Sequence, residues 1–83
     1  MKITIESTSK IVSVREPGGA HVPARIWEGE TETGIPVFCF ITRIAPRIQE
    51  PIPPDVAQAF AEQLQATRQP SPEMEAFPLR MIL

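Results

Sequence analysis

The fold is decided by two neighbouring stretches of sequence, HVPARIWE at residues 21–28 and IPVFCFITRI at residues 35–44. In the first, apolar residues occupy every second position from Val22 to Ile26, a pattern typical of a half-buried strand. The second is rich in β-branched and aromatic residues and is apolar on both faces between 35 and 41, which indicates a central strand covered on both sides. The polar connection between the two stretches predicts a β-hairpin.

Two further strands are expected before this hairpin. Residues 2–7 and 10–15 each alternate between apolar and polar side chains, and the serine- and threonine-rich residues 7–9 between them are a candidate turn. Pro23 cannot donate a hydrogen bond to a neighbouring strand, so the strand at 21–28 should begin at a sheet edge or after that residue.

A helix is expected after the proline-rich connection at residues 45–54. Pro54 suits the first helical position, and Val56, Phe60 and Leu64 recur at the spacing of one helix face. The apolar residues 77–83 at the end of the chain are interpreted as a last strand.

These elements predict an α+β fold in which residues 1–83 form a single small domain. It should contain an antiparallel sheet of about four strands, one amphipathic helix packed on the sheet, and a C-terminal strand. Phe38, Phe40, Phe60 and Leu64 are the expected core, with at least one of the two strand phenylalanines facing the helix. Because the core is thin and the terminus is apolar, we also expect a homo-oligomer.

The composition of the chain excludes several classes of function. The formal net charge of −2 argues against a dedicated DNA or RNA binder, which usually carries a basic surface. A single cysteine and a single histidine form neither a disulfide nor a metal ligand set, so we expect no metal and no cofactor. With no signal peptide and no apolar run of about 18 residues, we expect no membrane association and a cytoplasmic location.

Catalytic groups are sparse. Cys39 and His21 could form a nucleophile–base pair, but Cys39 lies between two phenylalanines, where a buried and inert thiol is the usual outcome. Glu28, Glu30 and Glu32 alternate near the hairpin and are interpreted as a solvated, charged tip. We therefore expect a protein with no catalytic residue rather than an enzyme.

The strongest candidate binding site combines Arg25, Trp27 and Arg43. Arg25 and Trp27 share one strand face, and hairpin pairing can bring Arg43 alongside them. An indole beside guanidinium groups can stack a planar ligand and hold its anionic group, which predicts a nucleotide-like ligand. The alternative is that Trp27 covers a small core while the arginines extend around it.

Several segments resemble one known group of proteins. PARIWEG at 23–29, TGIPV at 33–37 and TRIA at 42–45, with the opening residues 1–7 and the ending 78–83, are similar to short, uncharacterised proteins encoded by bacteriophages and prophages. The resemblance spans most of the chain and implies a phage origin and a bacterial host, but no activity and no site residue.

Three functional hypotheses follow. The first is a non-enzymatic, anti-defence type of interaction protein that binds a host protein or sequesters a small anionic ligand in the host cytoplasm, by analogy of context with other small acidic phage proteins. The second is a small structural or assembly component of a virion. The third is a small enzyme that uses Cys39 and His21.

Overall fold

The computed structural model describes residues 1–76 and 78, and these form a three-stranded antiparallel sheet with two helices. The strands are β1 (Ile3–Arg15), β2 (His21–Thr31) and β3 (Pro36–Ile41), in the spatial order β1-β2-β3. The helices are α1 (Pro54–Gln65) and α2 (Pro72–Ala76). The α+β class is confirmed, whereas the expected C-terminal strand lies outside the described residues.

The prediction of two short N-terminal strands is wrong, because residues 3–15 form one long strand with a bulge. Pairing with β2 shifts between Ser7 and Ile11, so that residues 8–10 face a single residue of the partner strand. The buried Thr8 stabilises this bulge: its hydroxyl donates to the Ile26 carbonyl at 2.7 Å. The supposed turn residues are therefore a bulge, and the described sheet has three strands rather than four.

The strand at 35–44 was expected to be central, but β3 covers only Pro36–Ile41 and lies at an edge of the sheet. The central strand is β2, which pairs with β1 on one side and with β3 on the other. Pro23 lies beyond the end of β3, where β2 has a neighbour on one side only, so its missing N–H breaks no ladder on the other side.

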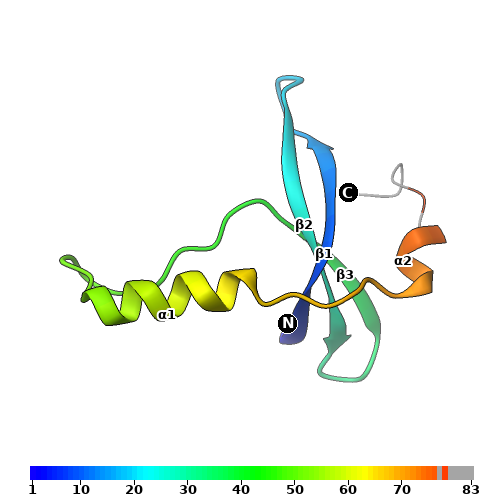
Figure 1. The fold of residues 1–83 in the computed structure, drawn as a ribbon. Helices are drawn as coiled ribbons and strands as arrows, with labels where there is room; N and C mark the ends of the chain where they lie inside the picture. Colours follow the sequence, from blue (N-terminus) through cyan, green and yellow to red (C-terminus); the bar gives the residue numbers. More distant parts are fainter. Residues whose placement is uncertain (77, 79–83) are drawn as a thin grey trace.

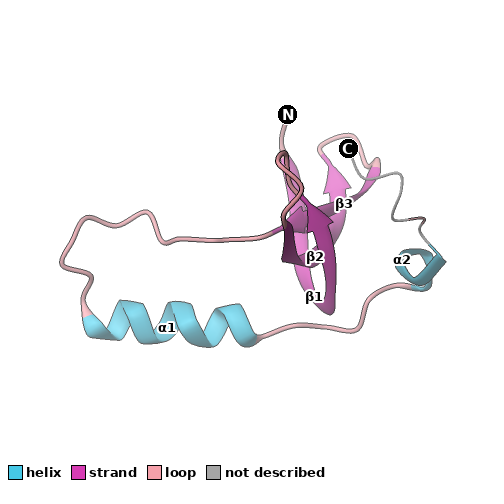
Figure 2. Cartoon of the chain, turned by 90° about the horizontal axis from the view of Figure 1, so that it is seen from above, coloured by secondary structure: helices cyan, strands magenta, loops and turns pink. Residues whose placement is uncertain are grey.

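The core lies on one face of the sheet, which we call the core face. Val12 and Ile26 are buried there together with Met74 of α2, and Val14, Phe38 and Phe40 pack against them. The short helix α2 therefore covers this face, and Figure 2 shows it on the opposite side of the sheet from α1. The expectation that Phe38 and Phe40 belong to the core is supported, but they share their face with Met74 rather than with the long helix.

The long helix is the largest departure from expectation. None of its residues is buried, Phe60 is only half-buried, and Leu64 is 37 % exposed. Figure 1 shows α1 projecting away from the sheet, joined to β3 by an extended segment that runs beside it. We call residues 42–65 the arm. Placing Phe60 and Leu64 in the core, and packing this helix on the sheet, were therefore wrong.

Candidate functional site

The sheet has a second face, which we call the open face, and the register assigns its residues. Trp27 pairs with Ser7 on one side and with Cys39 on the other, so their side chains share a face. The same register adds Arg25, flanked by Ile11 and Ile41. The further residues of this face are Ile3, Ile5, Ser13, Arg15, His21, Pro23, Gly29, Thr31 and Val37.

The structure brings the three expected site residues together at the base of the arm. Arg25, Trp27 and Arg43 line one open cavity of about 220 Å³. The remaining lining residues come from the end of β3, the start of the arm and the end of α1: Ile41, Thr42, Ile44 and Leu64. Strand pairing places Arg25 opposite Ile41, which brings the chain just beyond β3, and with it Arg43, alongside β2.

The two arginines of this cavity differ in exposure and in how their side chains are held. Arg25 is half-buried, and its Nη1 donates to the Thr8 carbonyl at 2.8 Å, so one end of its guanidinium is used to hold the β1 bulge. Arg43 is exposed. The cavity therefore offers one anchored cation, one exposed cation and a half-buried indole, which together can contact a planar anion.

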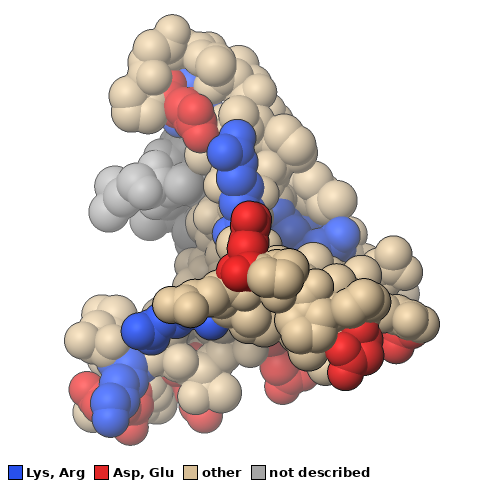
Figure 3. Space-filling view, turned by 90° about the vertical axis from the view of Figure 1, so that its left-hand side faces the viewer, with Lys and Arg blue, Asp and Glu red and all other residues tan. Residues whose placement is uncertain are grey.

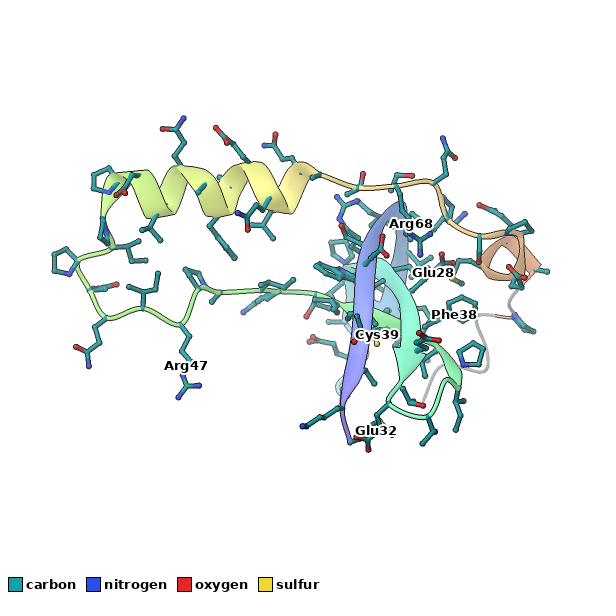
Figure 4. All side chains as sticks on the ribbon, turned by 90° about the horizontal axis from the view of Figure 1, so that it is seen from below. Glu28, Glu32, Phe38, Cys39, Arg47 and Arg68 are labelled. Atoms are coloured by element: carbon teal, nitrogen blue, oxygen red, sulfur yellow. The ribbon has the colours of Figure 1, made fainter. Side chains whose placement is uncertain are left out.

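The remaining groups that could bind or react are separated by the fold. Arg47 lies further along the arm and points away from α1 (Figure 4). Cys39 pairs with Trp27, whereas His21 pairs with Arg15 at the far end of β2. Six residues of strand separate these two positions, or about 20 Å, so Cys39 and His21 do not form a nucleophile–base pair within the chain.

Glu28 departs most from what its sequence pattern predicts. The alternation of Glu28, Glu30 and Glu32 predicts a solvated tip, yet only 6 % of the surface of Glu28 is exposed. Its Oε1 accepts from Arg68 Nη1 at 2.7 Å, and its Oε2 accepts from the Ser71 hydroxyl at 2.6 Å. The Ser71 backbone N–H also donates to both carboxylate oxygens, at 3.1 and 3.0 Å. Figure 4 shows Glu28 and Arg68 close together beside the sheet.

The hydrogen bonds decide the ionisation of Glu28. Burial by itself raises the pKa of the carboxyl, but the bonds from Ser71 and the cation of Arg68 outweigh burial and hold the pKa below its ordinary value of 4.5. The hydrogen bond that Arg68 donates to Glu28 in turn raises the pKa of Arg68. The carboxylate is therefore charged at neutral pH and its acceptor positions are filled, which fits a structural anchor for residues 68–71.

One signal in the sequence could have identified this anchor. Glu28 continues the alternation of Ala24 and Ile26, so its side chain must start on the core face. A carboxylate that starts on a buried face needs a donor, and the Arg68 side chain supplies one. Which of the arginines would do so depends on how the chain returns to the sheet after α1.

A larger cavity of about 460 Å³ lies beside this anchor on the core face. Its lining includes four glutamates, Glu6, Glu28, Glu30 and Glu73, with Arg68 as the basic residue among the described lining residues. This lining is unsuited to the anionic ligand expected from the sequence. Within residues 1–76 and 78, no three His, Cys, Asp or Glu side chains are grouped so that they could hold a metal ion.

Basic side chains do not form one continuous surface on the side of the molecule from which the arm projects. Figure 3 shows lysines and arginines interleaved with acidic side chains over this face. Among the described residues, no helix has the length and apolarity needed to cross a membrane.

Comparisons of the chain with models of protein families, with curated proteins and with solved structures find no match.

Proposed function

We propose that this chain is a non-enzymatic interaction protein, and that its binding surface consists of the apolar side of α1 and the open face of the sheet. The observation that carries the proposal is that α1 is amphipathic but has no buried residue. An amphipathic helix normally gains its stability by packing its apolar side against another surface. Ile44 and Ile48, which are 40 % and 43 % exposed, extend the apolar surface along the arm.

The open face supports the same proposal. Ile3 is 41 % and Ile11 is 53 % exposed, and Trp27, Cys39 and Ile41 are only half-buried. Contiguous exposed apolar surface on a small protein usually marks a site of protein–protein contact. The resemblance to phage proteins supplies a context for this surface, in which the chain is phage-encoded and acts on a component of the host cytoplasm.

Capture experiments with two matched variants test this proposal. Phe60→Lys places a charge in the apolar stripe of α1, whereas Gln58→Lys places the same charge on the polar side, where Gln58 already contacts Glu62. With chemical crosslinking in bacterial lysate, we expect wild type and Gln58→Lys to capture the same proteins. We expect Phe60→Lys to lose them. Equal capture by Phe60→Lys would contradict the proposal.

A second candidate function is the sequestration of a small planar anion by Arg25, Trp27 and Arg43. It is supported by the common cavity that these side chains line. This candidate ranks second because about 220 Å³ is below the roughly 300 to 1,000 Å³ typical of small-molecule sites, so a nucleotide would be only partly enclosed.

The fluorescence of Trp27 provides the test, because the chain has one tryptophan. If the cavity binds nucleotides, titration with ATP or GMP should change the emission of Trp27, and Arg43→Ala should weaken the effect. Arg47→Ala is the matched control, since Arg47 lies outside the cavity lining. An unchanged emission at millimolar nucleotide would reject this candidate.

A further inference from the structure

The chain exposes more surface than a compact monomer of its size. A folded monomer of 9.2 kDa is expected to expose about 4,900 Å², whereas this chain exposes 6748 Å². The surplus of about 1,800 Å² exceeds the roughly 800 Å² that each partner buries in a standard stable interface. The radius of gyration agrees, at 14.7 Å against about 12 Å for a compact chain of this length.

The arm is joined to its own sheet at its two ends, and the part between them projects from the sheet (Figure 1). Directly after α1, the Ala66 carbonyl accepts from the Ser7 hydroxyl at 3.0 Å. Arg68 then pairs with the edge of β1, where its N–H donates to Ser7 and its carbonyl accepts from Ser9. At the other end, the segment 45–54 carries four prolines, which restrict the backbone and favour an extended connection.

The apolar stripe of α1 matches the open face in length. Val56, Phe60 and Leu64 span eight residues of helix, or about 12 Å. On the open face, the apolar edge from Val37 to Ile41 spans four residues of strand, or about 13 Å. The same chain therefore supplies a helix with no buried residue and a sheet face with exposed and half-buried apolar residues. The last turn of α1 approaches this face, where Leu64 lines a cavity with Arg25 and Trp27, and the rest of the stripe lies further along the arm.

The two surfaces also carry opposite charges. Within α1 the charged residues are Asp55 and Glu62, both acidic. On the open face the register places two charged residues, Arg15 and Arg25, both basic. The strand glutamates, in contrast, fall on the core face by the same register. An acidic helix beside a basic sheet face favours association of the two in the correct orientation.

We propose that two copies of this chain exchange their arms reciprocally, so that the apolar stripe of α1 from each copy covers the open face of the sheet of the other. This inference rests on the proposed function, because it requires these surfaces to be binding surfaces, and it names a second copy as the partner. The arrangement has two-fold symmetry, and each copy gives a helix and receives one.

Mass measurement by light scattering between 1 and 100 μM is the first test. We expect twice the chain mass of 9.2 kDa, with a shift of Trp27 emission to shorter wavelength as the dimer forms, because Trp27 lies on the covered face. Phe60→Lys in the helix and Ile11→Lys on the open face should each weaken the dimer at least tenfold. Gln58→Lys, and Ile35→Lys in the hairpin turn, place the same charge outside the proposed interface and should leave it unchanged.

Mixing the two weakened variants tests reciprocity. A mixed dimer of Phe60→Lys with Ile11→Lys retains one intact helix and one intact open face, which meet each other, so mixing should restore association that neither variant shows alone. A dimer that tolerates Phe60→Lys, or a mixture that stays monomeric, would overturn arm exchange.

Different experimental results would overturn arm exchange and the proposed function. A wild-type chain that is monomeric at 100 μM, but captures other proteins in a way that Phe60→Lys abolishes, would overturn the exchange and leave the proposed function intact. A monomer whose capture is indifferent to Phe60→Lys would overturn both.

Discussion

Replacing Glu28 with glutamine is expected to destabilise the fold by about 2 to 4 kcal/mol. The carboxylate accepts from three donor groups, namely the Arg68 guanidinium and the N–H and hydroxyl of Ser71. Glutamine keeps one acceptor oxygen and turns an NH₂ group toward these donors. At least one charge-assisted bond is then lost, at about 1.5 to 3 kcal/mol, and the others weaken to neutral strength.

A loss of this size is a large share of the roughly 5 to 15 kcal/mol that stabilises a typical domain. We expect it to appear as a lower urea midpoint when unfolding is followed through Trp27 emission. The protein concentration must be held fixed, because self-association adds to apparent stability. Glu30→Gln is the matched control, since Glu30 lies on the same strand and the same face but is exposed.

The loss of stability caused by Glu28→Gln should become smaller as the pH falls. The pKa of Glu28 is lower in the folded chain than its ordinary value of 4.5, so the ionised carboxylate stabilises the fold fully above that value. This stabilisation is lost as the pH falls through the lowered pKa of the folded state. Wild type and Glu28→Gln should therefore differ most near pH 7 and converge in acid. Equal midpoints at pH 7, or an equal loss in Glu30→Gln, would refute the role assigned to Glu28.

Further stability predictions concern the sheet and the helices. Ile26→Ala removes a side chain that is 0 % exposed and should cost about 2 to 5 kcal/mol in urea unfolding; a smaller loss would mean that the core lies elsewhere. Met74→Ala should also destabilise the chain, and an unchanged midpoint would show that α2 does not cover the core face. Gly29→Ala would bring a Cβ into overlap with the Thr4 carbonyl and within 2.7 Å of the Ile5 Cα, so a lower melting temperature is expected. Phe60→Ala should leave the monomer's midpoint within about 1 kcal/mol of wild type, at a concentration below dimer formation; a loss of the size expected for Ile26→Ala would place α1 in the core.

Much of the local structure could be predicted from the sequence. Alternation in residues 21–28 places Ala24 and Ile26 on the buried face, and the proline at position 54 and the spacing of Val56, Phe60 and Leu64 define α1. These signals are local, because they depend on side-chain periodicity and on the backbone restriction of proline. The grouping of Arg25, Trp27 and Arg43 could be predicted in part, since two of them share a strand and the third follows its hairpin partner.

What only the tertiary structure decided is how these elements meet. The sequence at residues 7–9 is compatible with a turn, and it becomes a bulge because the Thr8 hydroxyl finds the carbonyl of Ile26, which lies 18 residues further along the chain. The sequence pattern predicts an exposed charge at Glu28, and the fold buries it because Arg68 and Ser71, which follow α1, donate hydrogen bonds to its carboxylate. Periodicity shows that α1 has an apolar side but carries no information on what covers it. The hydrogen bonds that join Ala66 and Arg68 to the edge of β1 fix where the chain returns to the sheet, and none of the residues of α1 is buried. Contacts between residues distant in sequence depend on the path of the whole chain.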